Sequence, residues 1–249
     1  MNQIQIKSAA RFLIDRRNHR ANRDRLAFDL RPMSNDDALA IQKATMELIG
    51  DEVGGWKTVL PVGDILNIAP IFSSNVHGAS HYPVRFQKNI CRIEPEIGFR
   101  FKKDLPVRDS AYSDKEIKDS LAGAHMVLEL IENRYHGDEE VTYLENLADC
   151  LFNQGLYVGP EIPLEKAINS PELDFVLTQG ESKIFKGKHP NNGPLLPVLW
   201  IANFLREQGV GIKSGQVVTT GSFAGVHEVQ AGSVFTIVYV GVGEMKIKF

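Results

Sequence analysis

Apolar residues recur at helical spacing along roughly the first fifty residues of the chain. One stripe, carried by Ala9, Phe12 and Leu13, predicts a surface helix within 8–26 that packs on the body of the protein. A capping pattern at 34–37 precedes a second stripe and predicts a second helix, which ends near Gly50. The apolar positions of this second helix are Ala38, Ile41, Ala44, Leu48 and Ile49.

The pattern changes to that of β-strands after a short strand at 54–60. Strand-like runs follow at 83–87, 91–101, 126–134, 155–161, 173–179, 182–187, 216–221 and 233–249. The segment 179–182 is typical of a hairpin turn between two of these runs. Two predicted helices interrupt the strands, one from 113 to about 124 and one from about 194 to 208.

The spacing of these elements predicts the fold class. Proline and glycine residues near 61–70 favour a boundary between a mainly helical part, 1–70, and a β-rich part, 71–249. Because strands dominate and the helices do not alternate with them, an α+β or mixed-β architecture is expected. Gly-x-Gly patterns at 209–211 and 241–243 do not open a helix after a strand, so dinucleotide binding is not expected.

The composition of the chain argues against several classes of function. The chain has 249 residues, 43% of them hydrophobic, and a net charge of −3 from 28 basic and 31 acidic residues. This balance gives no reason to expect a nucleic-acid partner. No apolar run is long enough to span a bilayer, and the first residues lack the apolar core of a signal peptide. Two cysteines without metal or redox spacing fit a cytoplasmic protein.

Two carboxylates in the run 91–101 are the main candidates for chemistry. Side chains alternate across a strand, so Glu94 and Glu96 share one face. Pro95 between them cannot donate to a neighbouring strand, which marks an edge or an irregular strand. Like charges side by side repel, and a cation between them would remove this cost. An oxygen-rich set suits Mg²⁺, Mn²⁺ or Ca²⁺; the alternative is a solvated strand face.

A third acidic residue lies in another apolar run. Glu129 has apolar neighbours on both sides, and such a carboxylate is costly to bury unless it is paired or bound to a metal. Glu132 is its rival, but the two have opposite strand parity. We expect Glu132 to pair with Arg134 instead.

Six segments resemble, in order and over nearly the whole chain, the motifs of one family. They are 55–57 (Gly-Trp-Lys), 93–99 (with Glu-Pro-Glu), 128–134, 148–149 with 155–159, 189–190 with 199–205, and 215–222. The family is the 2-keto-4-pentenoate hydratase/2-oxo-hydroxy-acid decarboxylase group of the fumarylacetoacetate hydrolase superfamily. The resemblance implies a mixed, rolled β-sheet core with a small N-terminal helical part.

The resemblance also implies roles for particular residues. Glu94, Glu96 and Glu129 would bind Mg²⁺ or Mn²⁺, and Lys57 would act as an acid–base or electrostatic group. Thr220 and Ser222 would hydrogen-bond the substrate carboxylate. A plain alternative for Lys57 is a surface lysine after a tight turn.

The chain departs from the family pattern at two places. The family often carries an acidic residue in the region that corresponds to 71–77, and here Asn75 or His77 stands near that position. His77 is a candidate replacement base because its pKa suits proton transfer near neutral pH, although a surface role is the alternative. Cys150 replaces an asparagine that is usual in the family after Ala-Asp.

The function implied by the resemblance is a metal-dependent hydratase in the catabolism of aromatic compounds. It would add water to a 2-hydroxy-2,4-dienoate and give a 4-hydroxy-2-oxo acid. The alternatives are a decarboxylase of 2-oxohex-3-enedioate (4-oxalocrotonate), a weakly active partner subunit in a hydratase–decarboxylase complex, and a C–C hydrolase of the wider superfamily. A homo-oligomer is expected from the family.

Overall fold

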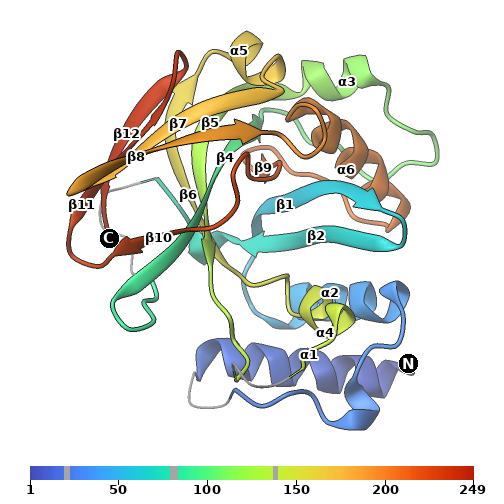
Figure 1. Cartoon of the computed structure of the whole chain (residues 1–249). Helices are drawn as coiled ribbons and strands as arrows, with labels where there is room; N and C mark the ends of the chain where they lie inside the picture. The colour runs from blue at the N-terminus through green and yellow to red at the C-terminus, as the bar shows by residue number, and fades with distance from the viewer. Residues whose placement is uncertain (20–22, 79–83, 137–139) are drawn as a thin grey trace.

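Two β-sheets and a layer of N-terminal helices form the chain, as seen in a computed structural model that describes residues 1–19, 23–78, 84–136 and 140–249 (Figure 1). In the described residues the larger sheet has the order β2-β1-β9-β4-β5-β6-β3, with β10 also paired to β4. The smaller sheet has the order β12-β11-β7-β8. The strands of the larger sheet are β1 Val53–Val62, β2 Ile65–Phe72, β3 Val76–His77, β4 Ile90–Phe101, β5 Leu121–Ile131, β6 Asn153–Ile162, β9 Val217–Thr219 and β10 His227–Gln230. Those of the smaller sheet are β7 Glu172–Gln179, β8 Glu181–Lys188, β11 Val234–Tyr239 and β12 Gly243–Lys248.

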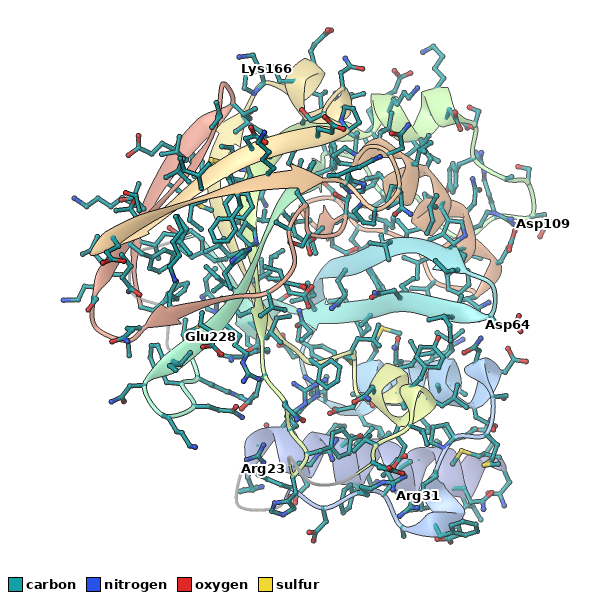
Figure 2. All side chains as sticks on the ribbon, in the orientation of Figure 1. Arg23, Arg31, Asp64, Asp109, Lys166 and Glu228 are labelled. Atoms are coloured by element: carbon teal, nitrogen blue, oxygen red, sulfur yellow. The ribbon has the colours of Figure 1, made fainter. Side chains whose placement is uncertain are left out.

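The two N-terminal helices and a short helix from the middle of the chain form a layer on one side of the β1–β2 hairpin (Figure 1). Helix α1 is Gln3–Asn18, α2 is Asn35–Leu48 and α4 is Tyr143–Ala148. Figure 2 shows Asp64 at the tip of this hairpin, where its carbonyl accepts a 2.6 Å hydrogen bond from the Asn35 side chain of α2. The helix expected within 8–26 begins earlier, at Gln3, because the Asn2 side chain caps it. Positions 20–22 of the expected range lie outside the described residues.

The second predicted helix is confirmed, with Ser34 accepting a hydrogen bond from the Asp37 N–H. The predicted boundary at residue 70 stays a prediction. The two long helices α1 and α2 end by residue 48, and β1 and β2 are strands of the larger sheet. The described part of the chain contains no helix that combines the length and apolar character needed to cross a membrane.

Most predicted strands are present, with shifted ends. The hairpin predicted at 179–182 joins β7 and β8, with Gly180 at φ +75°. The predicted helix from 113 to about 124 was too long: α3 (Asp114–Asp119) ends early, and β5 begins at Leu121. The long run 233–249 is two strands joined by a turn. The strand predicted at 83–87 is not formed at 84–86, and position 83 lies outside the described residues.

The other helical segments of the described chain are short except for α6. They are η1 Phe28–Leu30, η2 Ser73–Asn75, α5 Leu164–Ile168 and α6 Leu195–Glu207, and α6 corresponds to the helix predicted at 194–208. Helix α6 contacts β1, and residues of α2 and α6 line one cavity together with Trp56 and Ile68 of the β1–β2 hairpin.

Strand β4 is the central strand for the site. Its apolar face is buried in the main core, as the alternation predicts, through Ile93, Ile97, Phe99 and Phe101. On one side β4 pairs with β5 along residues 92–101. On the other side it pairs with β10 at 90–93 and with β9 at 98–100, which leaves a gap around Pro95. Pro95 therefore lies in an irregular stretch of a central strand rather than on an edge.

A glycine in β1 allows two strands of the larger sheet to lie close together. A Cβ atom on Gly55 would lie 2.5 Å from the Val217 carbonyl oxygen of β9. Strand β1 carries Lys57, so this close approach helps to set where the lysine lies relative to β4.

We expect Gly55→Ala to destabilise the protein by about 1–3 kcal/mol, because an overpacked site forces backbone shifts. Urea unfolding monitored by circular dichroism measures this change. Lys183→Ala on the exposed face of β8 is the control and should stay within about 0.5 kcal/mol of wild type. An equal effect of the two substitutions would contradict the packing argument.

Candidate metal centre

Two neighbouring strands bring three glutamates together. Glu94 of β4 and Glu129 of β5 are direct cross-strand partners, and Glu96 lies two residues further along the same face of β4. One carboxylate oxygen from each of the three lies within 4.8 Å of the others. Glu96 and Glu129 are buried, at 3% and 1% exposure, and Glu94 is half-buried. Like charges directly opposite each other destabilise a sheet, so this arrangement needs compensating positive charge.

One compensating charge comes from β1. The Lys57 ammonium lies 2.7 Å from a carboxylate oxygen of Glu129 and donates to the Leu151 carbonyl at 3.2 Å. The lysine is 8% exposed, so its stem is buried. The structure therefore brings together four of the residues that the sequence singled out, Lys57 and the three glutamates.

Further donors hold these carboxylates, and the sequence did not indicate them. The Thr219 hydroxyl and the Gly221 N–H, the latter at 2.7 Å, both donate to Oε2 of Glu96. The Asn153 side chain donates to Oε1 of Glu129 at 2.9 Å. Thr219 neighbours the predicted Thr220, but only the pairing of β9 with β4 places it beside Glu96. Asn153 follows the motif at 148–149 without any signal of its own.

The segment after β9 fills the gap beside Pro95. The Thr220 hydroxyl donates to the Ile97 carbonyl at 2.8 Å and is fully buried. The Ser222 hydroxyl donates to the carbonyls of Pro95, at 3.3 Å, and Gly225, at 3.1 Å. Both residues thus bond β4 where it lacks a partner strand. Ser222 also lines the cavity described below, and the substrate contacts expected for Thr220 and Ser222 both stay predictions.

The electrostatics of the site favour uptake of cations. Burial, followed by the charges of nearby carboxylates, raises the pKa of Glu94 to about 7 and that of Glu96 to about 8. Burial alone would lower the pKa of Lys57, but Glu129, Glu94 and Glu96 outweigh it and raise this pKa. The ammonium form of Lys57 is therefore stabilised.

The donor set fits a divalent metal. Lys57 compensates one of the three negative charges, so two carboxylates remain without a cationic partner among the residues of this cluster. A charge of +2 would balance them, and carboxylate oxygens are the ligands that hard divalent cations prefer. Glu94, Glu96 and Glu129 are the residues that would hold the ion. Their assignment as ligands stays a prediction that this geometry supports.

Two other candidates lie elsewhere. His77 lies in β3, at the far end of the larger sheet, and its Nε2 lies 2.6 Å from the Ser74 carbonyl oxygen. It is not part of the cavity wall that the structure describes. Glu132 pairs with Arg85 at 3.2 Å, and the Arg134 guanidinium binds Asp149 instead, so the expected Glu132–Arg134 pair was wrong.

A small cavity opens beside the three glutamates. Its volume is about 240 Å³, and its wall combines the charged cluster with apolar and amide groups. The lining residues are Lys57, Thr58, Val59, Asn67, Glu94, Glu96, Glu129, Pro190, Gly221, Ser222 and Gly225. A compact organic acid of a few carbon atoms suits this size.

Comparison with known proteins identifies relatives of the chain. It is 22% identical over 232 residues to the 2-keto-4-pentenoate hydratase of Paraburkholderia phymatum, covering 90% of this chain and 85% of that protein. It is 25% identical over 167 residues to the hydratase of the same name from Paraburkholderia xenovorans, covering 64% of this chain and 58% of that protein. No model of a known protein family matches the chain.

Solved structures show the same fold. The 4-oxalocrotonate decarboxylase of Pseudomonas putida G7, solved with calcium and acetate, superposes with a TM-score of 0.78 at 20% identity, covering 100% of this chain and 98% of that one. A second structure of the decarboxylase, with magnesium and adipate, gives a TM-score of 0.76 at 19% identity. The family resemblance and the α+β fold with a rolled mixed sheet, both expected from the sequence, are thus confirmed.

The raised carboxyl pKa values predict how stability depends on pH without metal. Folded Glu94 and Glu96 retain protons that the unfolded chain releases near pH 4.5, so stability is present below that pH and is lost as the pH rises toward 8. In excess chelator, we expect wild type to lose roughly 2–4 kcal/mol relative to Glu96→Gln between pH 5 and pH 8. Urea unfolding at several pH values measures this difference.

Added Mn²⁺ should restore the stability of wild type at pH 8 and have little effect at pH 5, where protons compete for the carboxylates. Glu244→Gln on the exposed face of β12 is the control and should follow wild type throughout. Parallel pH curves for wild type and Glu96→Gln would contradict the account of this buried cluster.

Proposed function

We propose that the chain is a divalent-metal-dependent hydro-lyase that adds water to a short 2-hydroxy-2,4-dienoate of the 2-keto-4-pentenoate type and gives a 4-hydroxy-2-oxo acid. The observation that carries the proposal is the buried set of three glutamates with Lys57 beside a small cavity. The hydratase relatives support the same reaction class.

Mg²⁺ or Mn²⁺ is the proposed ion, held by Glu94, Glu96 and Glu129. When bound, it would supply a Lewis acid for the oxygen atoms at the acidic end of the substrate. The fixed donors on Glu96 and Glu129 keep two of these carboxylates in place. Because a ligand set of this kind is preorganised, it needs little reorganisation during a reaction.

Lys57 is the proposed proton-transfer group. Its ammonium lies among the three carboxylates, and its raised pKa keeps it protonated at neutral pH. Hydration of a dienol requires a proton to be delivered to carbon, and a positioned ammonium can donate it. Besides the charged cluster and Thr58, the described cavity wall carries two polar side chains, the amide of Asn67 and the hydroxyl of Ser222. Either could orient the substrate or the added water.

The cavity wall favours a substrate with one carboxylate. Among the lining residues that the structure describes, Lys57 is the only cation, and it is already paired with Glu129. A second carboxylate at the distal end of a substrate would therefore find no basic partner there, and burying it unpaired would be costly. Val59 and Pro190 offer apolar contacts instead. This favours 2-hydroxypenta-2,4-dienoate over 2-oxohex-3-enedioate, the substrate of the decarboxylase alternative.

The cellular setting is part of the same proposal. A cytoplasmic homo-oligomer acting in the catabolism of aromatic compounds, alone or with a decarboxylase-type chain, is supported by the family resemblance. The relatives include a 2-keto-4-pentenoate hydratase, a 2-oxo-hept-4-ene-1,7-dioate hydratase and a 2-hydroxyhexa-2,4-dienoate hydratase.

The direct test follows the ultraviolet absorbance of 2-hydroxypenta-2,4-dienoate. With Mg²⁺ or Mn²⁺, wild type should consume the dienoate and form 4-hydroxy-2-oxopentanoate, and excess chelator should stop the reaction. Glu96→Ala should lose at least about a hundredfold in turnover, because it removes a buried ligand. Full activity of Glu96→Ala would contradict the metal mechanism.

Product analysis separates the alternatives. CO₂ from 2-oxohex-3-enedioate without hydration of the dienoate would indicate the decarboxylase. Two carbon fragments would indicate a C–C hydrolase. Turnover that appears only after a second chain is added would indicate a partner subunit.

Lys57→Met should separate catalysis from metal binding. We expect kcat to fall by about 10²–10⁴-fold because the proton donor is lost. Mn²⁺ affinity should stay the same or increase, because Lys57 no longer competes for Glu129. Steady-state kinetics and Mn²⁺ titration followed by electron paramagnetic resonance measure the two effects. Loss of Mn²⁺ binding together with kcat would argue that Lys57 mainly maintains the structure of the site.

A further inference from the structure

A turn with unusual backbone geometry lies behind the Lys57–Glu129 pair. Three consecutive residues that are not glycine, Cys150, Leu151 and Phe152, have φ values of 61°, 51° and 62°. The left-handed region is unfavourable for such residues and persists only where the surroundings enforce it. The turn links α4 to β6 and therefore precedes Asn153 directly.

This turn contacts both members of the pair. The Leu151 carbonyl accepts a hydrogen bond from the Lys57 ammonium at 3.2 Å. The Asn153 side chain donates to Oε1 of Glu129 at 2.9 Å, the same oxygen that lies 2.7 Å from Lys57. A shift of the turn would thus move the partners of the lysine and of the carboxylate together.

One guanidinium holds the two ends of the turn. Arg134, which is 5% exposed, donates to the Asp149 carbonyl at 2.5 Å and to the Asn153 carbonyl at 2.8 Å. Its Nε also donates to Oδ2 of Asp149 at 2.7 Å. The planar fork of an arginine can make these bonds simultaneously, and a lysine cannot.

Two other buried arginines contact only one end of the turn. Arg16 donates to Oδ2 of Asp149 at 2.7 Å, and Arg17 donates to the Asp149 carbonyl at 2.9 Å. Arg16 is 2% exposed and stacks over the ring of Tyr135. In the described residues Arg134 is therefore the arginine that joins Asp149 to Asn153.

We propose that Arg134 is a positioning residue. By hydrogen-bonding both Asp149 and Asn153, it fixes the left-handed turn that orients Lys57 and Glu129 in the site. The effect on turnover rests on the proposed reaction, whereas the effect on metal affinity rests only on the proposed metal site. The chain of contacts runs from Arg134 through Asn153 to Glu129 and through Leu151 to Lys57.

Arg134→Lys keeps the positive charge but cannot bond Asp149 and Asn153 simultaneously, so it tests the role of these hydrogen bonds. We expect Mn²⁺ affinity, measured by electron paramagnetic resonance, to fall about 10- to 100-fold, as for other groups that hold metal ligands. With the dienoate, kcat should fall about tenfold or more while KM changes less than threefold. Arg16→Lys is the matched control, with a similar burial and the same partner Asp149. It should lower Tm but leave Mn²⁺ affinity and kcat within about twofold of wild type.

Asn153→Ala isolates the next contact in the chain. It should reproduce the loss of Mn²⁺ affinity, and Arg134→Lys added to it should cause no further loss, because the two act in series. Unchanged affinity in Asn153→Ala would overturn the proposal even if Arg134→Lys does not fold. Equal losses in Arg134→Lys and Arg16→Lys would also overturn it. If wild type shows no turnover, the proposed function fails, and the ranking of Mn²⁺ affinities still decides the role of Arg134.

Discussion

The cross-strand pair Glu94–Glu129 is the constraint on which the rest of this site depends. Two carboxylates that face each other directly on neighbouring strands repel, and the buried Glu96 next to them adds to the cost. Lys57 offsets one negative charge, and hydrogen bonds from Thr219, Gly221 and Asn153 stabilise the ionised forms. Two negative charges then remain uncompensated beside a small cavity. A divalent ion that balances them would connect the fold to the proposed chemistry.

The fold provides this site by interrupting the pairing on one side of a central strand. Strand β4 is paired with β5 over most of its length, but on its other side β10 and β9 leave a gap around Pro95. The segment 220–222 fills the gap with hydroxyl and N–H donors, so the backbone is satisfied while one face of β4 stays open to the cavity.

Residues close in sequence were predictable, and those joined only by strand register were not. Period-2 alternation was enough to place Glu94 and Glu96 on one face and four apolar residues on the other. Glu129 was singled out by its apolar neighbours, but its role as a ligand and the role of Lys57 came from the family resemblance, because the pairing of β4 with β5 and of β1 with β9 cannot be read from spacing. Thr219 and Asn153 were missed for the same reason: the bond from Thr219 to Glu96 spans 123 positions. The end of α3 was misplaced because a capping box fixes where a helix begins and not where the next strand takes over.

Crystals grown with Mn²⁺ would show directly whether a divalent ion binds between Glu94, Glu96 and Glu129. We expect one anomalous difference peak per chain, with an oxygen of each glutamate about 2.0–2.3 Å away, and a lengthened Lys57–Glu129 contact. Density without such a peak, with the Lys57–Glu129 pair intact and the carboxyls of Glu94 and Glu96 in mutual hydrogen-bond contact, would contradict this expectation. The cluster would then be neutralised by the lysine and by protons alone.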